Sequence, residues 1–469
     1  MRKTFLALAL AALIAGCAST PAPPPTLDLP PASAGDLKLE RWWTAFGDPT
    51  LDTLVDEALA HNLDIAAAIA RVEYGRALVL LAQSDQYPTV DLSVGASRSR
   101  STQVGSNPLP FGFSPLATDL AVGLQASYEA DLWGKYRTAT AAARRDLMAT
   151  EFAREGVRTM VEADTARYYF NLLAADVQLQ LLEDTLKLRD ESVALQKDRY
   201  QAGVIGEYDL RTAEAERAAV AGDIAVARRA RTEFESALAV LLGRSPREVF
   251  APMIARDVEV ARATSVPTLP SGVPSDVLAR RPDIQRAEAQ LAAANLRIDV
   301  AKADYFPAIS LTGNYGTQAG ALKNLFTGPG VVWGLAASLL QPLIGLKAIE
   351  ANVDAQTARR NEVLINYVQA VQGAFRDAHD ALSANDTTRE ALAAQSERSS
   401  KLQQALELSQ LRYTAGYSPY LEVLDAQRQL LQAQTLQIIA ARNVRLSLVD
   451  FAKAVGGGWE YKTAVVLEQ

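Results

Sequence analysis

The chain has 469 residues, a formal net charge of −7 and a single cysteine. The negative charge argues against nucleic acid as a partner, and one cysteine excludes an internal disulfide. Length alone would suggest about three domains, but the internal duplication set out below overrides that estimate.

Residues 1–16 are predicted to be a lipoprotein signal peptide. Arg2 and Lys3 form a basic start, and a short apolar run leads to small residues placed directly before Cys17, a pattern typical of bacterial lipoproteins. Cys17 is therefore the expected lipidation site, where the chain would carry a covalent N-acyl diacylglycerol. Ala18, where an aspartate would favour the inner membrane, favours the outer one. An ordinary signal peptide beside an incidental cysteine is the alternative.

Residues 17–41 are expected to form a lipidated tether. Six prolines lie between Ser19 and Gly35, a composition that favours an extended chain. No later window of about 18 apolar residues is free of charges, so a transmembrane helix is not predicted.

Four segments alternate between apolar and polar residues, at about 89–98, 119–132, 308–317 and 331–341. This period predicts strands with one apolar and one polar face, which suits a half-buried soluble sheet as well as a membrane barrel. Gly-, Pro- and Ser-rich loops join the strands in pairs, and their length suits the extracellular loops of outer-membrane barrels.

The number of strands bears on the oligomer. Four strands cannot close a barrel in lipid, because an open edge leaves backbone groups unsatisfied. Eight strands from a dimer would be filled by side chains, whereas twelve strands from a trimer would leave a lumen. If the strands cross a membrane, a trimer is predicted.

Two very long helices are predicted at about 134–200 and 344–413, where proline is absent and glycine is rare. A continuous helix of that length extends roughly 100 Å at about 1.5 Å per residue. Each is followed by a tight turn and a return helix, at about 208–243 and 419–455, whose apolar residues recur every seven positions and predict coiled-coil packing. A cytosolic coiled-coil scaffold would have a similar helix pattern, but the predicted signal peptide and the amphipathic strands argue against it.

The chain is internally duplicated. Residues 199–216 match residues 412–429, which lie 213 positions later, and the segment from Tyr87 matches the segment from Phe306 at an offset of 219. Each copy reads helix, strand, strand, very long helix, tight turn and return helix, so the repeat fixes the architecture. The predicted parts are a first repeat at 42–268, a second repeat at 269–458 and a C-terminal tail at 459–469.

Three motifs resemble the TolC-type outer-membrane efflux channel family in its lipoprotein branch, the outer-membrane factors of tripartite efflux systems. They are the aromatic segment 42–49, the strand-to-helix junction 128–135 and the turn 412–416 with Leu424 to Gln427 after it. The resemblance extends from Trp42 to about Gly457.

This resemblance implies a mainly α fold with a transmembrane β-barrel. Long helices would form a coiled-coil barrel across the periplasm, and the four strands of each protomer would close as a 12-stranded barrel in a homotrimer. The protein would be lipid-anchored in the outer membrane, with an equatorial region that includes about 244–274.

The same resemblance implies a passive exit duct, which receives substrates from a periplasmic adaptor and a proton-driven inner-membrane pump of the resistance-nodulation-division (RND) class. No cofactor and no catalytic role are expected, because no convergent catalytic constellation is visible. A duct for an ABC-driven secretion system and a scaffold without a pore are the alternatives. A metal-efflux role finds no support, since His61 and His379 do not cluster with other ligands.

The family's acidic periplasmic gate corresponds here to Glu422 and Asp425. Rings of such residues around a narrow axis would favour cations and would raise one another's pKa values. Alternatively, both are solvated residues near the start of a helix, where negative charge is favourable.

The family's tip lock corresponds to a predicted ion pair between Asp209 and Arg412, with Tyr413 as a further hydrogen-bonding or packing residue. In some relatives an arginine lies two residues after the tip glycine, but this chain has Ser418 there. The exposed turns resemble the surface that contacts the adaptor. Its predicted residues are Gly203, Val204, Gly416, Tyr417 and Ser418.

Overall fold

The computed structural model describes residues 41–458, except for 106–109, 111, 252–253, 255, 257–266, 268 and 270–279. The predicted signal peptide, the tether with Cys17 and the tail at 459–469 lie outside the described residues. The described chain forms two compact units.

The sheet unit comprises Val72–Thr150 and Ala287–Tyr367, and the hairpin unit comprises the described chain up to Arg71, Glu151–Arg286 and everything from Val368 on. The two longest helices, at 135–201 and 346–414, and the helices at 63–84 and 282–303 contribute to both units. The elements are η1 (Trp42–Phe46), α2 (Pro49–His61), α3 (Leu63–Ser84), β1 (Thr89–Arg100), β2 (Leu116–Glu129), α4 (Lys135–Gln201), α5 (Glu207–Leu241), α6 (Pro246–Phe250), α9 (Pro282–Ala303), β3 (Ala308–Ala319), α10 (Leu322–Leu325), η2 (Gly328–Gly330), β4 (Val331–Leu340), α11 (Leu346–Thr414) and α12 (Tyr420–Ala454).

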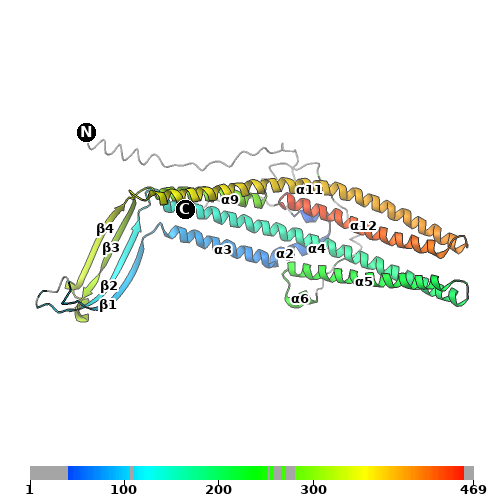
Figure 1. Ribbon diagram of the computed structural model, residues 1–469, viewed down its shortest axis with the longest axis horizontal. Helices are drawn as coiled ribbons and strands as arrows, with labels where there is room; N and C mark the ends of the chain where they lie inside the picture. Colours follow the sequence, from blue (N-terminus) through cyan, green and yellow to red (C-terminus); the bar gives the residue numbers. More distant parts are fainter. Residues whose placement is uncertain are drawn as a thin grey trace, which may run out of the picture. The chain divides into compact units, whose positions relative to one another are not determined.

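The four predicted strands form one antiparallel sheet in the order β1-β2-β3-β4 (Figure 1). Each repeat contributes one β-hairpin to the sheet. The pairing of β2 with β3, in which Leu124 lies opposite Tyr315, joins the two repeats. Strand β2 ends at Glu129, earlier than the alternation suggests, because Asp131 turns back to accept a 2.9 Å hydrogen bond from the backbone N–H of Arg137.

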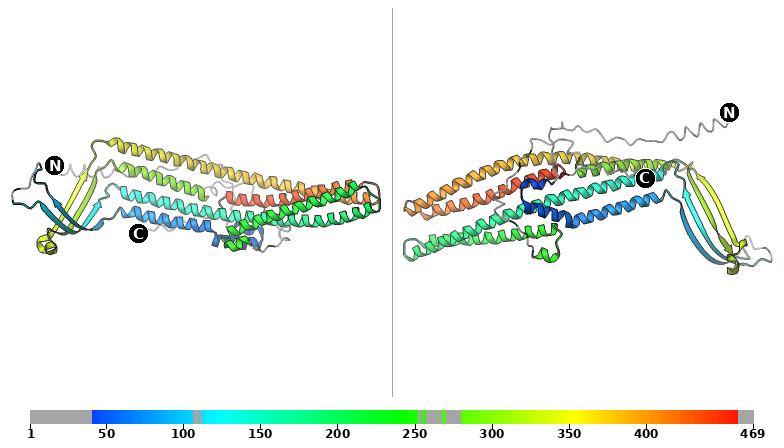
Figure 2. Two further views of the ribbon diagram at one scale, coloured as in Figure 1. Left: turned by 60° about the horizontal axis from the view of Figure 1, so that its bottom comes forward. Right: turned by 180° about the vertical axis from the view of Figure 1, so that it is seen from behind.

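The two predicted long helices are present as α4, with 67 residues, and α11, with 69 residues. Figure 2 shows each of them turning back into its return helix, α5 or α12. The heptad ladder of α5 faces inward, since Ala213, Val220 and Ala227 are all buried. The fold class, mainly helical with four antiparallel strands, is therefore confirmed.

The main core of the hairpin unit lies where the chain's first described residues meet α4. Trp42, Trp43 and Phe46 are buried there, and the ring centroid of Phe46 lies 4.7 Å from that of Phe170. Asp48 caps α2 and also accepts a 2.6 Å hydrogen bond from the hydroxyl of Tyr169. These contacts fix the base of the hairpins and leave their turns at the far end.

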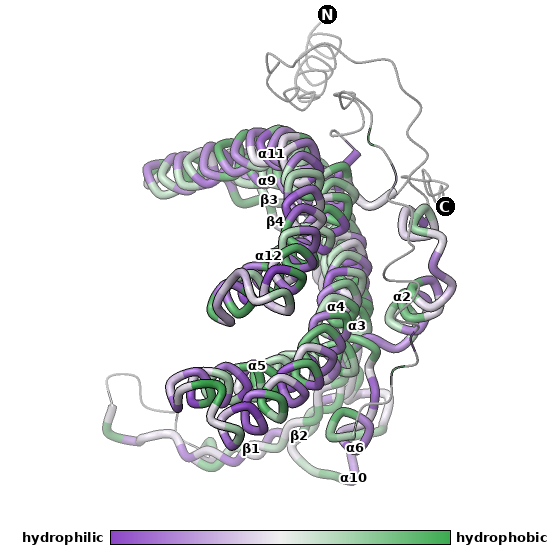
Figure 3. The backbone as a smooth tube through the Cα atoms, turned by 90° about the vertical axis from the view of Figure 1, so that its right-hand side faces the viewer, coloured by the Kyte–Doolittle hydropathy of each residue, from purple (hydrophilic) through white to green (hydrophobic). Residues whose placement is uncertain are grey.

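Hydrophilic and hydrophobic residues are interspersed along α5 and α12 (Figure 3). Among the described residues, no helix combines the length and the apolar character that a membrane crossing would need.

Candidate functional site at the hairpin tips

Each helical hairpin ends in a tip turn, which lies between α4 and α5 in the first repeat and between α11 and α12 in the second. The two tip turns have the same backbone conformation, as the match at an offset of 213 residues predicts. In the first, the N–H of Gly203 donates to Tyr200 O and the N–H of Val204 donates to Arg199 O, both at 2.9 Å. In the second, the N–H of Gly416 donates at 3.0 Å to the residue three positions earlier, and the next N–H donates at 2.9 Å to the residue five positions earlier. This is the Schellman arrangement, which needs a left-handed residue.

Both tip glycines meet that need, with φ of 71° at Gly203 and 79° at Gly416. The residues after them are exposed, Val204 by 68% and Tyr417 by 81%. Ser418 is half-buried, and its hydroxyl oxygen has no hydrogen-bond partner among the described residues. The turns therefore present a small surface with one large aromatic ring, and their contact with an adaptor stays a prediction.

The two predicted gate acids lie near the start of α12, and both are exposed. Asp425 accepts a 2.6 Å hydrogen bond from the side chain of Gln429. Glu422 lies 3.8 Å from Arg412, measured from Oε2 to Nη1. Helix α12 thus places one acid free of ion pairs with the described residues and one acid beside a cation.

The predicted lock residue Arg412 therefore contacts a predicted gate residue. Within the described part of this single chain, its ion pair is with Glu422 and not with Asp209. Glu422 is the counterpart of Asp209 at the 213-residue offset. The Asp209–Arg412 pair stays a prediction.

Tyr413 connects the two hairpins. Its hydroxyl accepts hydrogen bonds from Arg199 and, at 3.3 Å, from the side chain of Gln196, both on α4. The Arg199 guanidinium carbon lies 5.0 Å from the Tyr413 ring centroid, a cation–π distance. The ring centroid of Tyr420 lies 5.6 Å from that of Tyr413.

The contact continues along α4 away from the turn. Ser192 shares a hydrogen bond with the hydroxyl of Tyr420, and Arg189 donates to the side chain of Gln427. Arg189 is buried, and burial lowers the pKa of its guanidinium. We call these α4 residues the polar ladder: Arg189, Ser192, Gln196 and Arg199.

Sequence reasoning missed the polar ladder. Its members recur at spacings of three and four residues, so they share one face of α4. A polar stripe at those spacings was the available signal. It stands out because α4 is apolar two to three turns further from the tip, where Leu179 and Leu182 are buried.

A buried carboxyl group at the base of the hairpins was also missed. The side chain of Glu162 is only 7% exposed, and its Oε1 lies 3.5 Å from Arg158 Nε. Burial raises the pKa of Glu162 to about 7, although Arg158 opposes the shift.

No group of three or more histidine, cysteine, aspartate or glutamate side chains in the described chain could hold a metal ion. The tip site is thus an arrangement of charges, hydrogen bonds and aromatic rings around two turns.

Comparison with known proteins identifies the family. The model of the outer membrane efflux protein family matches residues 54–244 and 273–457. The chain belongs to this family. The double match confirms the duplication, and membership of a channel family makes the chain an outer-membrane efflux component and not an enzyme.

Relatives of known role cover most of the chain. The solvent efflux pump outer membrane protein SrpC of Pseudomonas putida is 33% identical over 415 residues, which cover 88% of this chain and 86% of SrpC. The cation efflux system protein CusC of Escherichia coli K12 is 30% identical over 419 residues, with 89% and 88% covered.

Solved channels have the same fold. The CmeC outer membrane channel of Campylobacter jejuni superposes with a TM-score of 0.85 at 27% identity and covers 94% of this chain and 95% of CmeC. The open state of the MtrE outer membrane channel of Neisseria gonorrhoeae gives a TM-score of 0.80 at 31% identity, with 93% and 97% covered.

Proposed function

We propose that the chain is the passive outer-membrane exit duct of a tripartite efflux pump, working as a homotrimer whose twelve strands close one barrel. Cys17 would carry the lipid anchor. A periplasmic adaptor would contact the tip turns, and an inner-membrane RND pump would supply the energy. The observation that carries the proposal is the duplicated chain itself, with two long hairpins and a four-stranded sheet whose edges β1 and β4 are unpaired within the described chain.

The tip would be the closable end of this duct. Three copies of Glu422 and Asp425 around one axis would concentrate negative charge and favour cations. Arg412 beside Glu422 would reduce that charge in the closed state. Movement of Arg412 away from Glu422, toward a partner such as Asp209 of the neighbouring copy, would change both the charge and the width of the opening.

The polar ladder would hold the two hairpins of one protomer together while the tip opens. Its contacts are partly buried and involve charged donors, which makes them stronger than exposed ion pairs. The Arg412–Glu422 contact is exposed on both sides and weak. Opening would therefore break the exposed Arg412–Glu422 contact before the contacts of the polar ladder.

The cargo would be chosen by the pump and not by the duct. The named cargoes of the relatives include solvents for SrpC, cations for CusC and antibiotics for ArpC of Pseudomonas putida. One fold thus serves unrelated chemistries, which fits a common exit path.

Crosslinking of the tagged protein in living cells, followed by mass spectrometry of its inner-membrane partner, tests the proposal. We expect an RND pump together with its adaptor. An ABC exporter in their place would overturn the efflux assignment and make the channel a secretion duct. Absence of conductance by the purified protein in a planar bilayer would overturn the duct itself.

A further inference from the structure

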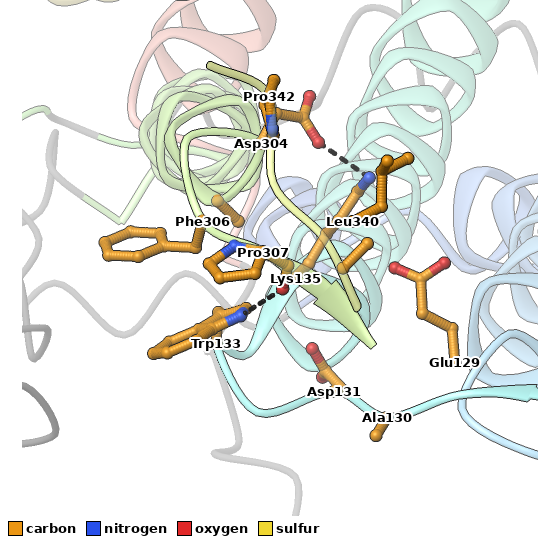
Figure 4. A pocket seen from close by; sticks show the side chains of 12 residues that line it. Glu129, Ala130, Asp131, Trp133, Lys135, Asp304, Phe306, Pro307, Leu340 and Pro342 are labelled. Carbon is orange, nitrogen blue, oxygen red and sulfur yellow. Dashed lines mark hydrogen bonds and ion pairs between the residues drawn. The ribbon is translucent and has the colours of Figure 1, made fainter. Parts of the chain in front are cut away.

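The two repeats meet in a joint at the end of the sheet where strands give way to helices (Figure 4). Trp133, after β2, stacks on Phe306, before β3, with ring centroids 4.9 Å apart. The indole N–H of Trp133 donates to the carbonyl of Pro307 at 2.7 Å. Lys135, the first residue of α4, forms a 2.8 Å ion pair with Asp304 at the end of α9.

We call this arrangement the repeat joint. It borders a cavity of about 260 Å³ that the end of β4 also lines. The parts of the joint come from β2 and α4 of the first repeat and from α9 and β3 of the second. The duplication supplies each of these parts a second time.

The second set of parts is present in the sequence, with Ile344 in place of the tryptophan and the lysine shifted by one position. Asp85, Tyr87 and Pro88 precede β1 and correspond to Asp304, Phe306 and Pro307 at the 219-residue offset. At an offset of 211, Ile344 and Gly345 correspond to Trp133 and Gly134, with Lys347 close to the position of Lys135. Gly134 and Gly345 also share a left-handed φ, at 78° and 89°.

This second set cannot meet within one chain. One half adjoins β1 and the other half adjoins β4, and these strands are the opposite edges of the sheet. Neither Asp85 nor Lys347 has an ion pair with another described residue of the chain. Ile344 is 95% exposed, whereas its counterpart Trp133 is covered by Phe306.

The helix before each joint shows the same contrast. Ala293 of α9 is fully buried, and one turn later Arg297 forms an ion pair with Asp146 of α4. The counterpart of Ala293 in α3 is Tyr74, which is 67% exposed, and Leu81 further along the helix is 65% exposed. The face of α9 that contains Ala293 is therefore covered, whereas the equivalent face of α3 is exposed, although its side chains are larger and apolar.

We propose that a second copy of this chain completes the joint. The end of α3 and the start of β1 from one copy dock on the end of β4 and the start of α11 of the next. Asp85 pairs with Lys347, and Tyr87 packs on Ile344. The pairing of β1 with β4 satisfies the open edges, which would otherwise be exposed in lipid. The inference rests on the proposed homotrimer and names the residues that hold it together.

Chemical crosslinking of engineered cysteines tests the contact. In the full-length chain, Asp85→Cys together with Lys347→Cys is treated with a short bismaleimide in outer membranes. We expect covalent dimers and trimers on a denaturing gel. The only native cysteine is Cys17, whose sulfur the proposed lipid would occupy, so the engineered thiols should be the reactive ones.

Two matched pairs serve as controls. Lys135→Cys with Asp304→Cys should react within one chain and form no multimers. Asp85→Cys with Lys323→Cys should not crosslink, because Lys323 lies beside the opposite end of β3. If the control pair within one chain reacts and the 85/347 pair yields only monomer, the proposed contact is wrong.

A charge exchange supplies a second readout. Asp85→Lys should lower the fraction of oligomer in detergent several-fold, and adding Lys347→Asp should restore it. No recovery in the double variant counts against the pair. If native mass spectrometry finds only monomer in the unaltered protein, the homotrimer of the proposed function fails as well. A trimer that neither crosslinks nor shows charge rescue overturns this contact alone.

Discussion

The two hairpin tips have the same backbone conformation, but their arginines contact different partners. Arg199 and Arg412 occupy equivalent positions before equivalent turns. Arg199 reaches across to the other hairpin and lies over the ring of Tyr413, whereas Arg412 contacts Glu422 of its own hairpin from an exposed position. The two copies thus retain the same turn but differ in the partners of the arginine. Arg199 connects the two hairpins, whereas Arg412 is exposed and free to move.

The largest effect is expected from the charges of the second tip. Glu422→Ala combined with Asp425→Ala should reduce cation selectivity and change single-channel conductance several-fold, because acidic rings select cations. Measurement is by planar-bilayer recording of the purified protein. Asp209→Ala, at the counterpart of Glu422, is the control and should change selectivity less. Unchanged conductance and selectivity in the double variant would remove both residues from the gate.

The two arginines should separate stability from leakage. Arg199→Ala removes a partly buried, charged hydrogen bond and a cation–π contact, which should lower the free energy of unfolding by about 1–3 kcal/mol. Arg412→Ala removes an exposed pair and should cost less than about 1 kcal/mol. Arg412→Ser should nevertheless make cells more permeable to large antibiotics such as vancomycin.

Thermal unfolding in detergent and antibiotic susceptibility measure these two effects. Arg199→Lys is the matched control, since it keeps the charge but loses the planar group that stacks on Tyr413, and it should recover only part of the stability. Equal losses of stability in the two alanine variants would contradict the assignment of different roles.

The tip glycines test whether the turns are equivalent. A Cβ added at Gly203 or at Gly416 would meet no atom within 4 Å, so the cost of Gly→Ala is the left-handed backbone alone. We expect about 1 kcal/mol at each site. Circular dichroism melts of the two single variants should agree. A much larger loss at one glycine would show that its turn is packed against another copy.

The architecture could be predicted from the sequence because it depends on periodic patterns. Strand alternation, heptads and the 213-residue repeat each report a structure that many residues determine together. The partners of single side chains could not be predicted in the same way. Tyr413 was expected at the tip, but its contact with Arg199 depends on how α4 packs on α11. Arg412 lies beside Glu422 because a tight turn brings together residues ten positions apart.

The smallest effect, and the one that separates the base of the hairpins from their tips, is a pH dependence at Glu162. Burial raises its pKa from 4.5 to about 7, so the folded chain keeps a proton that the unfolded chain loses. The stabilisation is complete below about pH 4.5 and is lost as the pH rises through about 7.

Glu162→Gln, which mimics the protonated acid, should match the unaltered protein at pH 4.5 and melt at a higher temperature above pH 7. Glu422→Gln, which removes an exposed carboxylate, controls for the lost charge. If the melting temperatures of the unaltered protein and Glu162→Gln change in parallel across this range, Glu162 does not titrate there and stays ionised beside Arg158.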